Sequence, residues 1–361
     1  MAEPFKNLVN AESIARIGQA VAAVAPFDAA GFERRAVAGL EPLELKARIR
    51  HVAGALRAYL PGDWRESVRV LLAALPEQPP AKVADGLTWW PLLQLVETHG
   101  LDHPETSLAA LRVLTCHASA EFAVRPYLER HPDLAWAHVD AWSRDPSEHV
   151  RRLASEGTRP RLPWASRLDA SVRDPARGLA IIERLVDDPS EYVRRSVANH
   201  LGDVAKDHPA LAVEVARRWL PGRRRLVEHA LRDLLKKGHP AALDLLGHKG
   251  QVEVSALGVD PPRARPGEAI EVTATITGPG TARVDVVWAW PGTRGWSSKT
   301  FRGAVRELSE GDRWHFRQRL SMRPVTTRPL RPGEQRVFLR VNGIDHGPAT
   351  FLLLDADPPR E

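Results

Sequence analysis

Arginines and carboxylates share one face on two predicted helices of this chain. The sets at helical spacing are Arg152, Glu156 and Arg159 in the first helix, and Arg195, Asn199, Asp203 and Lys206 in the second. Side chains three or four positions apart on a helix are neighbours, so each set forms a mixed strip of charge. A solvated face laced with ion pairs, each worth about 0.2–0.5 kcal/mol, would have the same pattern. Because the strip recurs in successive helices, one continuous functional surface is an equally good interpretation.

The residue types in these strips indicate two kinds of chemistry. A guanidinium can hold two phosphate oxygens at once, whereas a carboxylate repels a polyanion. Carboxylates among phosphate-binding arginines therefore indicate a task other than affinity, and the candidates are Glu121, Glu156 and Asp203. Beside a nucleotide sugar, a carboxylate can stabilise positive charge at C1′ or orient water as the N-glycosidic bond breaks. Such help is sufficient for a base that already leaves easily, as a cationic alkylated base does.

A proline-broken segment carries a further candidate group. The run Arg159-Pro160-Arg161-Leu162-Pro163-Trp164 is predicted to be a loop, because proline disrupts a helix interior. It places Trp164 among basic residues. Trp164 could fill a gap between two helix pairs, or it could act as a wedge that stacks against sugar and base. Under the second interpretation, Arg161 and Trp164 both contact nucleic acid.

An internal repeat shows which elements position these residues. The octet 145–152 (Asp-Pro-Ser-Glu-His-Val-Arg-Arg) returns at 188–195 with one change, 43 residues later (188 − 145), and a fainter copy begins at Arg224. Repeats of about 40–47 residues with two helices each are typical of HEAT proteins, which stack helix pairs into a solenoid. His-Pro dipeptides at 103, 131, 208 and 239 are expected to start helices, because proline suits the first turn. The expected buried stripe of one helix is Val193, Val197, Leu201 and Val204.

Residues 253–361 change to the alternation of β-strands. The stretches with a period of two are 271–276, 284–290, 314–320, 337–341 and 351–354. Six or seven strands in about 110 residues are typical of an immunoglobulin-like β-sandwich. We expect Trp288 and Trp290 in its core, and Arg294, Trp296 and Lys299 in a loop. The predicted fold is mainly α with a separate all-β domain: a HEAT-like α-solenoid, 1–248, then the β-sandwich, with a linker near 246–253.

Net charge, apolar runs, cysteine content and missing motifs limit the classes of protein to which this chain can belong. The 361 residues carry a net charge of +6 and have a pI near 9.7, which favours an anionic partner. No apolar run approaches the ~20 residues of a membrane span, and the start does not read as a secretory signal, so we expect a cytoplasmic, bacterial nucleoid-associated monomer. Cys116 is the only cysteine, which excludes an internal disulfide and a cysteine-based metal site. Motifs of nucleotide, serine-hydrolase and zinc-protease sites are absent, so any catalysis is expected to use water without metal or cofactor.

Several segments, specific as a set, carry a family resemblance. They are Phe5-Lys6-Asn7, Gly39 to Arg48 (GLEPLELKAR), Glu121 to Pro126 (EFAVRP) and the repeated Asp-Pro-Ser-Glu-x-Val-Arg-Arg. With these segments, most of residues 1–248 resembles the AlkC/AlkD superfamily of HEAT-like-repeat alkylpurine DNA glycosylases, and its AlkC branch in particular. A C-terminal immunoglobulin-like domain occurs on a subset of AlkC-type proteins, in agreement with the predicted sandwich.

The resemblance implies a monofunctional enzyme that grips the DNA backbone without placing the base in a protein pocket. The implied partner is double-stranded DNA containing 3-methyladenine and, for the AlkC branch, 3-methylcytosine and 1-methyladenine. Glu121 falls at the family's catalytic carboxylate, and Arg152 at a phosphate-binding arginine of the AlkD branch. The chain departs from AlkD at its cleft aromatics, where Asn199 or His200 stands at one position and Cys116-His117 at the other. This departure favours the AlkC branch.

Three functions are compatible with these observations. The first is a DNA glycosylase, with Glu121, Glu156 and Asp203 as catalytic carboxylates. Its predicted DNA contacts are Arg152, Arg159, Arg161, Trp164, Arg195, Asn199 and Lys206. The second is a non-catalytic HEAT-repeat protein that binds DNA structure with the same surface. The third is a protein scaffold, whose binding would change little with salt, whereas phosphate contacts weaken steeply as salt rises.

Overall fold

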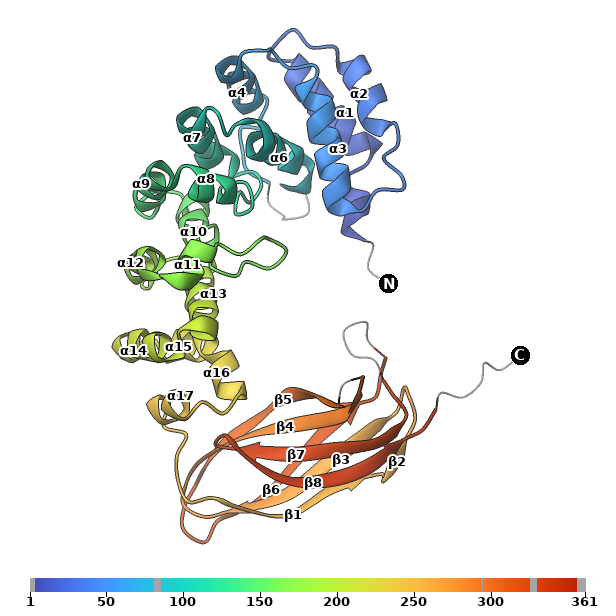
Figure 1. Cartoon of the computed structure of the whole chain (residues 1–361), viewed down its shortest axis with the longest axis vertical. Helices are drawn as coiled ribbons and strands as arrows, with labels where there is room; N and C mark the ends of the chain where they lie inside the picture. The colour runs from blue at the N-terminus through green and yellow to red at the C-terminus, as the bar shows by residue number, and fades with distance from the viewer. Residues whose placement is uncertain (1–3, 81–85, 294, 325–329, 356–361) are drawn as a thin grey trace, which may run out of the picture. The chain divides into compact units, whose positions relative to one another are not determined.

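The structure is a computed structural model that describes residues 4–80, 86–293, 295–324 and 330–355. The chain forms two compact units, Met1–Asp207 and His208–Glu361, whose elements are labelled in Figure 1. Helices give way to strands between Leu245 and Glu253. Within the described ranges, no helix combines the length and the apolar content needed to cross a membrane.

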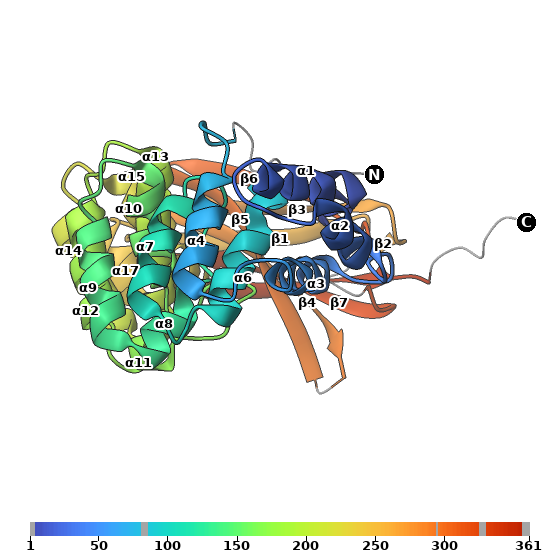
Figure 2. The ribbon, with the colours of Figure 1, turned by 90° about the horizontal axis from the view of Figure 1, so that it is seen from above.

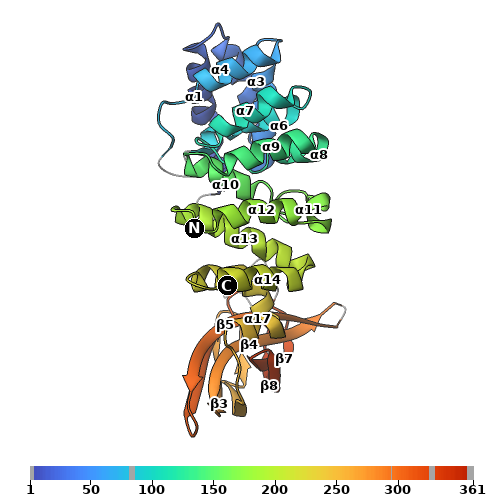
Figure 3. The same ribbon diagram turned by 90° about the vertical axis from the view of Figure 1, so that its left-hand side faces the viewer.

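The first unit is built from stacked helices. Their bounds are η1 Phe5–Leu8, α1 Ala11–Ala22, α2 Ala29–Val37, α3 Leu45–Arg57, α4 Trp64–Ala73, η2 Leu87–Trp89, α6 Trp90–His99, α7 Pro104–Leu114, α8 Arg125–Arg130, α9 Pro132–Trp142, α10 Glu148–Glu156, α11 Asp169–Arg173, α12 Ala176–Leu185 and α13 Glu191–Asp207. Helices α1, α2 and α3 pack together at the start of the unit (Figure 2). Further along, α10 packs against α9, α12 and α13, as layers of the stack in Figure 3. The predicted HEAT-like pairing of helices is therefore confirmed.

Helix starts follow local hydrogen-bonding signals. The side chain of Asn10 accepts from Ser13 N at 2.9 Å, while Ser13 Oγ accepts from Asn10 N at 3.0 Å, which forms a capping box at α1. Asp28 and Asp63 cap α2 and α4 in the same way, through one backbone N–H each. Each His-Pro proline is the first residue of a helix, in α7, α9, α14 and α17, which confirms that prediction.

The repeated octet forms the end of a loop and the start of the helix that follows, α10 in the first copy and α13 in the second. Ion pairs connect the first copy to the repeats on either side of it. Asp145 and Asp188 each accept a backbone N–H from the serine two residues on. Arg151 then donates to Asp188 through Nε at 2.6 Å and Nη2 at 2.9 Å, and Arg112 donates to Asp145 at 2.6 Å. In both copies the matching arginine, Arg151 or Arg194, also donates to the two carbonyls at the start of its own octet.

The packing of the helices agrees with the apolar pattern except at one end. The stripe Val193, Val197, Leu201 and Val204 is at most 1% exposed. Helix α1, in contrast, ends at Ala22 and not at residue 25. The spacing of Ile14, Ile17, Val21 and Val24 in the sequence predicts one buried face over residues 11–25. Val24 instead lies beyond the helix and is 38% exposed, so this part of the prediction was wrong.

The second unit joins four helices to a two-sheet sandwich. Its elements are α14 Pro209–Trp219, α15 Arg224–Ala230, α16 Arg232–Lys236, α17 Pro240–Leu245, β1 Glu253–Asp260, β2 Arg263–Ala264, β3 Ala269–Thr277, β4 Gly280–Gly292, β5 Gly295–Leu308, β6 Arg313–Ser321, β7 Gly333–Val341 and β8 Ile344–Leu353. One sheet has the order β1-β3-β6 and the other β2-β8-β7-β4-β5 (Figure 1). Apolar side chains from both sheets form one core, in which Trp288 is 1% and Trp290 8% exposed, as predicted.

Strand β5 corrects the expectation of a loop around Trp296. Trp296 lies in the strand, opposite Pro291 of β4, and is 46% exposed. Lys299 pairs with Trp288 in the same ladder, and Arg294 lies outside the described residues. Most β5 side chains are exposed, so the sequence of this strand lacks the alternation of apolar and polar residues from which a strand is predicted. Cross-strand hydrogen bonding to β4, which a local pattern does not encode, creates this strand.

Candidate functional site

A cleft of about 660 Å³ opens in the first unit beside the turn that precedes α8. Its aromatic lining includes Phe5 of η1, Trp90 of α6, Phe122 of the turn, Trp164 of the loop after α10, and Tyr192 of α13. The carboxylates of Glu121 and Glu156 line the same cleft. Flat apolar rings beside buried acids suit a flat ligand that carries or develops positive charge.

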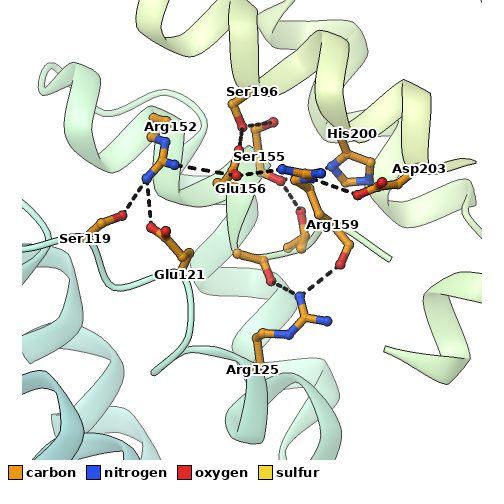
Figure 4. Close-up of polar contacts among 12 residues, drawn as sticks. Ser119, Glu121, Arg125, Arg152, Ser155, Glu156, Arg159, Ser196, His200 and Asp203 are labelled. Atoms are coloured by element: carbon orange, nitrogen blue, oxygen red, sulfur yellow. Dashed lines mark hydrogen bonds and ion pairs between the residues drawn. The ribbon is translucent and has the colours of Figure 1, made fainter. Parts of the chain in front are cut away.

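Glu121 is held in place by an arginine from the next repeat. Arg152 Nη1 donates to Glu121 at 2.8 Å and also to the hydroxyl of Ser119 (Figure 4). Burial raises the pKa of the Glu121 carboxyl, the positive charge of Arg152 lowers it, and the negative charge of Glu156 raises it. The net direction is upward. A carboxylate kept partly out of water in this way interacts strongly with a cation placed next to it.

Arg152 lies between two carboxylates and one aromatic ring. Its guanidinium is 2.8 Å from Glu121 and 3.5 Å from Glu156, and it stacks 4.8 Å from the centre of the Tyr192 ring. Only 14% of the side chain is exposed. The hydrogen bonds and the stacking fix Arg152, and Arg152 in turn fixes the direction of Glu121.

A second layer of ion pairs supports Glu156. Arg159 bridges Glu156 at 2.7 Å and Asp203 at 2.8 Å, and Ser196 Oγ donates to Glu156 at 2.6 Å (Figure 4). Burial alone would raise the pKa of Glu156, but Arg152 and Arg159 together hold it below its ordinary value. Glu156 is therefore firmly anionic. Asp203, at 2% exposed, lies behind Arg159 and not at the cleft surface.

The backbone of the Trp164 loop is held by hydrogen bonds, although the Trp164 side chain is exposed. Arg125 donates to the carbonyls of Gly157 (3.0 Å), Arg159 (2.9 Å) and Ser166 (2.6 Å), which clamps both ends of the loop. Trp164 has φ of +67°, a left-handed conformation that costs a non-glycine residue about 1–3 kcal/mol. Its side chain is 72% exposed. Trp164 does not fill a gap between helix pairs, which leaves the interpretation as a contact residue.

The remaining predicted contacts lie at different depths. Arg161 forms a two-pronged pair with Asp207 at 2.6 and 2.7 Å and is 30% exposed. Lys206 pairs with Asp203 at 2.9 Å and is 39% exposed. Arg195 pairs along its own helix with Glu191 at 3.1 Å and, among the residues that the structure describes, is not part of the ion-pair network of Glu121 and Asp203.

The two positions at which the chain departs from AlkD differ in their surroundings. His200 is fully buried, its Nδ1 bonds to Ser155 O at 3.0 Å, and burial lowers its pKa to about 4. It is a neutral core residue, whereas Asn199 is half-buried. Cys116 and His117, in contrast, both line the cleft.

Several cleft residues were missed by the sequence analysis. They are Ser119, Phe122, Trp90, His149 and Tyr192. Ser196, which is buried behind the cleft and donates to Glu156, was missed as well. A signal for two of them existed, because His149 and Tyr192 occupy the one position at which the repeated octets differ. The centres of their two rings are 5.9 Å apart, and both residues line the cleft. The one position at which the octets differ therefore faces the cleft, where the shared glutamate of the first copy, Glu148, lies as well.

Comparison with known proteins agrees with this geometry. Residues 112–217 match the family model described as DNA alkylation repair enzyme, and residues 253–355 match the C-terminal Ig-like domain of uncharacterised protein YhaZ. The uncharacterized protein YhaZ of Bacillus subtilis (strain 168) is 35% identical over an alignment of 309 residues that covers 83% of this chain and 85% of that one. The Pseudomonas fluorescens alkylpurine DNA glycosylase AlkC, solved bound to DNA containing an abasic site analog, has a TM-score of 0.91 and 37% identity, covering 98% of this chain and 100% of that chain.

The fold and these matches define a DNA alkylation repair protein with an added Ig-like domain. More narrowly, the chain belongs to the family of AlkC-like alkylpurine DNA glycosylases. The family resemblance of the sequence is thereby confirmed.

Proposed function

We propose that the protein excises cationic N-alkylated bases from double-stranded DNA by hydrolysing the N-glycosidic bond. The proposed substrates are 3-methyladenine and, in addition, 3-methylcytosine and 1-methyladenine. The observation that carries the proposal is the Glu121 carboxylate, oriented by Arg152 at the wall of an aromatic cleft. The DNA-bound state of the similar Pseudomonas fluorescens AlkC supports the nature of the partner.

The reaction needs no covalent intermediate with the protein. The bond between C1′ and the base nitrogen breaks with both electrons on the base, which discharges the positive charge of the alkylated base. Water adds to the cationic C1′ and releases a proton, leaving free base and an abasic sugar. At ~4 Å and an effective dielectric of ~20, Glu121 would stabilise the sugar cation by roughly 4 kcal/mol, or about a thousandfold in rate.

The three carboxylates divide this work in our proposal. Glu121 meets the sugar cation, and Glu156, on the same cleft, adds negative potential and directs the water. Asp203 acts indirectly, because it is buried and its ion pair with Arg159 holds that guanidinium against Glu156. Arg152 and Arg159, at 14% and 7% exposed, are occupied by carboxylates. Their main task is therefore to orient those carboxylates.

The more accessible cations are the proposed phosphate contacts. Arg161, Arg195 and Lys206 expose 30%, 66% and 39% of their side chains. Trp164 stacks against the DNA at the lesion, and Asn199 contributes a polar contact. Affinity for DNA should fall steeply as salt rises, because each neutralised phosphate releases counterions.

The test compares wild-type protein with Glu121→Gln on DNA containing methylated bases. The amide keeps the shape of the side chain but lacks its charge, so release of 3-methyladenine should fall by about a thousandfold. Chromatography of the released bases is the measurement. Affinity for DNA with an abasic site analogue should be nearly unchanged, which serves as the folding control. Wild-type protein that binds such DNA but releases no base would instead establish a non-catalytic binder.

A further inference from the structure

Lys46 of α3 connects the Trp164 loop to the turn that carries Glu121. Its ammonium donates a hydrogen bond to the backbone carbonyl of Trp164 and stands 4.8 Å from the centre of the Phe122 ring. Phe122 directly follows Glu121 in the chain and stacks on Trp90 of α6, with ring centres 5.7 Å apart. One side chain thus contacts both walls of the cleft.

The hydrogen bond of Lys46 falls where the loop is most strained. Arg125 holds carbonyls on both sides of Trp164, at Gly157, Arg159 and Ser166. Lys46 holds the carbonyl of Trp164 itself, the residue with φ of +67°. Packing contacts do little to fix the position of the Trp164 indole, since the residue is 72% exposed. Its direction therefore depends on its backbone, and Lys46 is bonded to that backbone.

Lys46 approaches the cleft wall from behind. Trp90, Phe122 and Trp164 line both the cleft and a smaller hollow of about 170 Å³ on its other side. Lys46 lines this second hollow, together with Arg50 one turn further along α3. A side chain in this place reaches the reacting groups through Phe122 and Trp164.

We propose that Lys46 is a positioning residue that fixes Trp164 at a set distance from Glu121. The inference rests on the proposed excision of alkylated bases and deepens it. A direct phosphate contact is the competing role, because Lys46 is exposed and positively charged. The two roles differ in one respect. If Lys46 acts by positioning Trp164, its replacement has no further effect on excision once the indole has been removed.

The experiment is a double-mutant cycle of Lys46→Met and Trp164→Ala, because methionine keeps most of the aliphatic stem and loses the donor. Single-turnover excision of 3-methyladenine at saturating enzyme is measured for wild type, both single variants and the double variant. Arg50→Met is the matched control, since it removes the same charge from the same helix and hollow. Lys46→Arg restores a donor, and thermal unfolding confirms that each variant is folded.

Lys46→Met should slow excision about tenfold, since small misplacements of a reacting group cost up to about a hundredfold. In the Trp164→Ala background, Lys46→Met should change the excision rate less than about twofold. Arg50→Met should also change the rate less than about twofold in the wild-type background. Lys46→Arg should keep most of the wild-type rate. Equal losses from Lys46→Met with and without the indole, or an equal loss from Arg50→Met, would overturn the positioning role. If wild type releases no base, the proposed function fails. The same cycle, measured as affinity for abasic-analogue DNA, then decides the positioning role.

Discussion

Glu121 combines two opposing influences in one carboxyl group. Burial raises its pKa, and the guanidinium of Arg152 at 2.8 Å lowers it, with the upward direction prevailing. A carboxylate left in bulk water would be ionised over a wider pH range but would attract a sugar cation far less, because water screens charge. The pairing with Arg152 therefore lets Glu121 stay anionic in a place where its charge is effective.

Excision should depend on pH in a direction set by this shift. The ionised form of Glu121 is the active one, so the rate is full above its raised pKa and falls as the pH drops through it. Arg152→Met removes the group that lowers the pKa, so the acid limb of the profile should move to higher pH. Single-turnover rates across the pH range measure this. Arg161→Met, which removes a cation paired elsewhere, should leave the limb in place, and an Arg152→Met limb at unchanged or lower pH would contradict the assignment.

At the scale of helices and loops, the repeated octet assigns its two arginines different tasks. Arg151 is directed to the loop of the next repeat, where it pairs with Asp188. Its neighbour Arg152 points to the cleft and pairs with Glu121. Adjacent positions on a helix are about 100° apart, so one arginine can serve packing while the next serves the site.

The packing arginine should matter for stability far more than an exposed one. Arg151→Met leaves Asp188, which is 3% exposed, without its partner, and breaking a buried pair costs about 3 kcal/mol or more. Arg195→Met breaks the pair with Glu191, whose side chains are 66% and 76% exposed, and should cost about 0.5 kcal/mol or less. Urea unfolding of both variants provides the comparison. Equal destabilisation by the two substitutions would refute the division of tasks.

For the molecule as a whole, helices α14–α17 belong with the sandwich in one compact unit. Arg340 of β7 donates to Lys236 O at 2.6 Å, and Thr281 N donates to Lys249 O at 2.9 Å. A Cβ added to Gly343 would lie 2.7 Å from the carbonyl oxygen of Gly238. The proposed domain boundary near residues 248–253 therefore falls inside a segment fastened on both sides.

Filling the contact between Gly238 and Gly343 should loosen the whole second unit. Gly343→Ala adds both a steric clash and a left-handed alanine at φ +87°, whereas Gly222→Ala adds only the latter at φ +77°, with open space around it. Gly222→Ala should cost about 1 kcal/mol, and Gly343→Ala a further 1–3 kcal/mol or so. Hydrogen exchange should accelerate in α16, α17, β7 and β8 together. Acceleration in β7 and β8 alone would show that these helices unfold independently of the sandwich.

Local patterns were sufficient for much of this architecture. The octet at 145–152 and 188–195, the apolar stripe of α13 and the His-Pro helix starts depend on neighbours within a few residues, so they can be read from the chain. The resemblance carried by several segments together, among them Glu121 to Pro126, added the family. Trp288 and Trp290 were predicted in the core because residues two apart in a strand share one face, and both are buried there.

Contacts between distant residues established the rest. Lys46 and Trp164 are 118 positions apart, and Arg159 meets Asp203 across 44. No local pattern shows that Arg159 is buried while Trp164 is exposed, because both depend on which side chains the folded chain brings alongside. The residue types in the cleft are a property of the sequence, whereas their depth, pairing and pKa values arise from long-range packing.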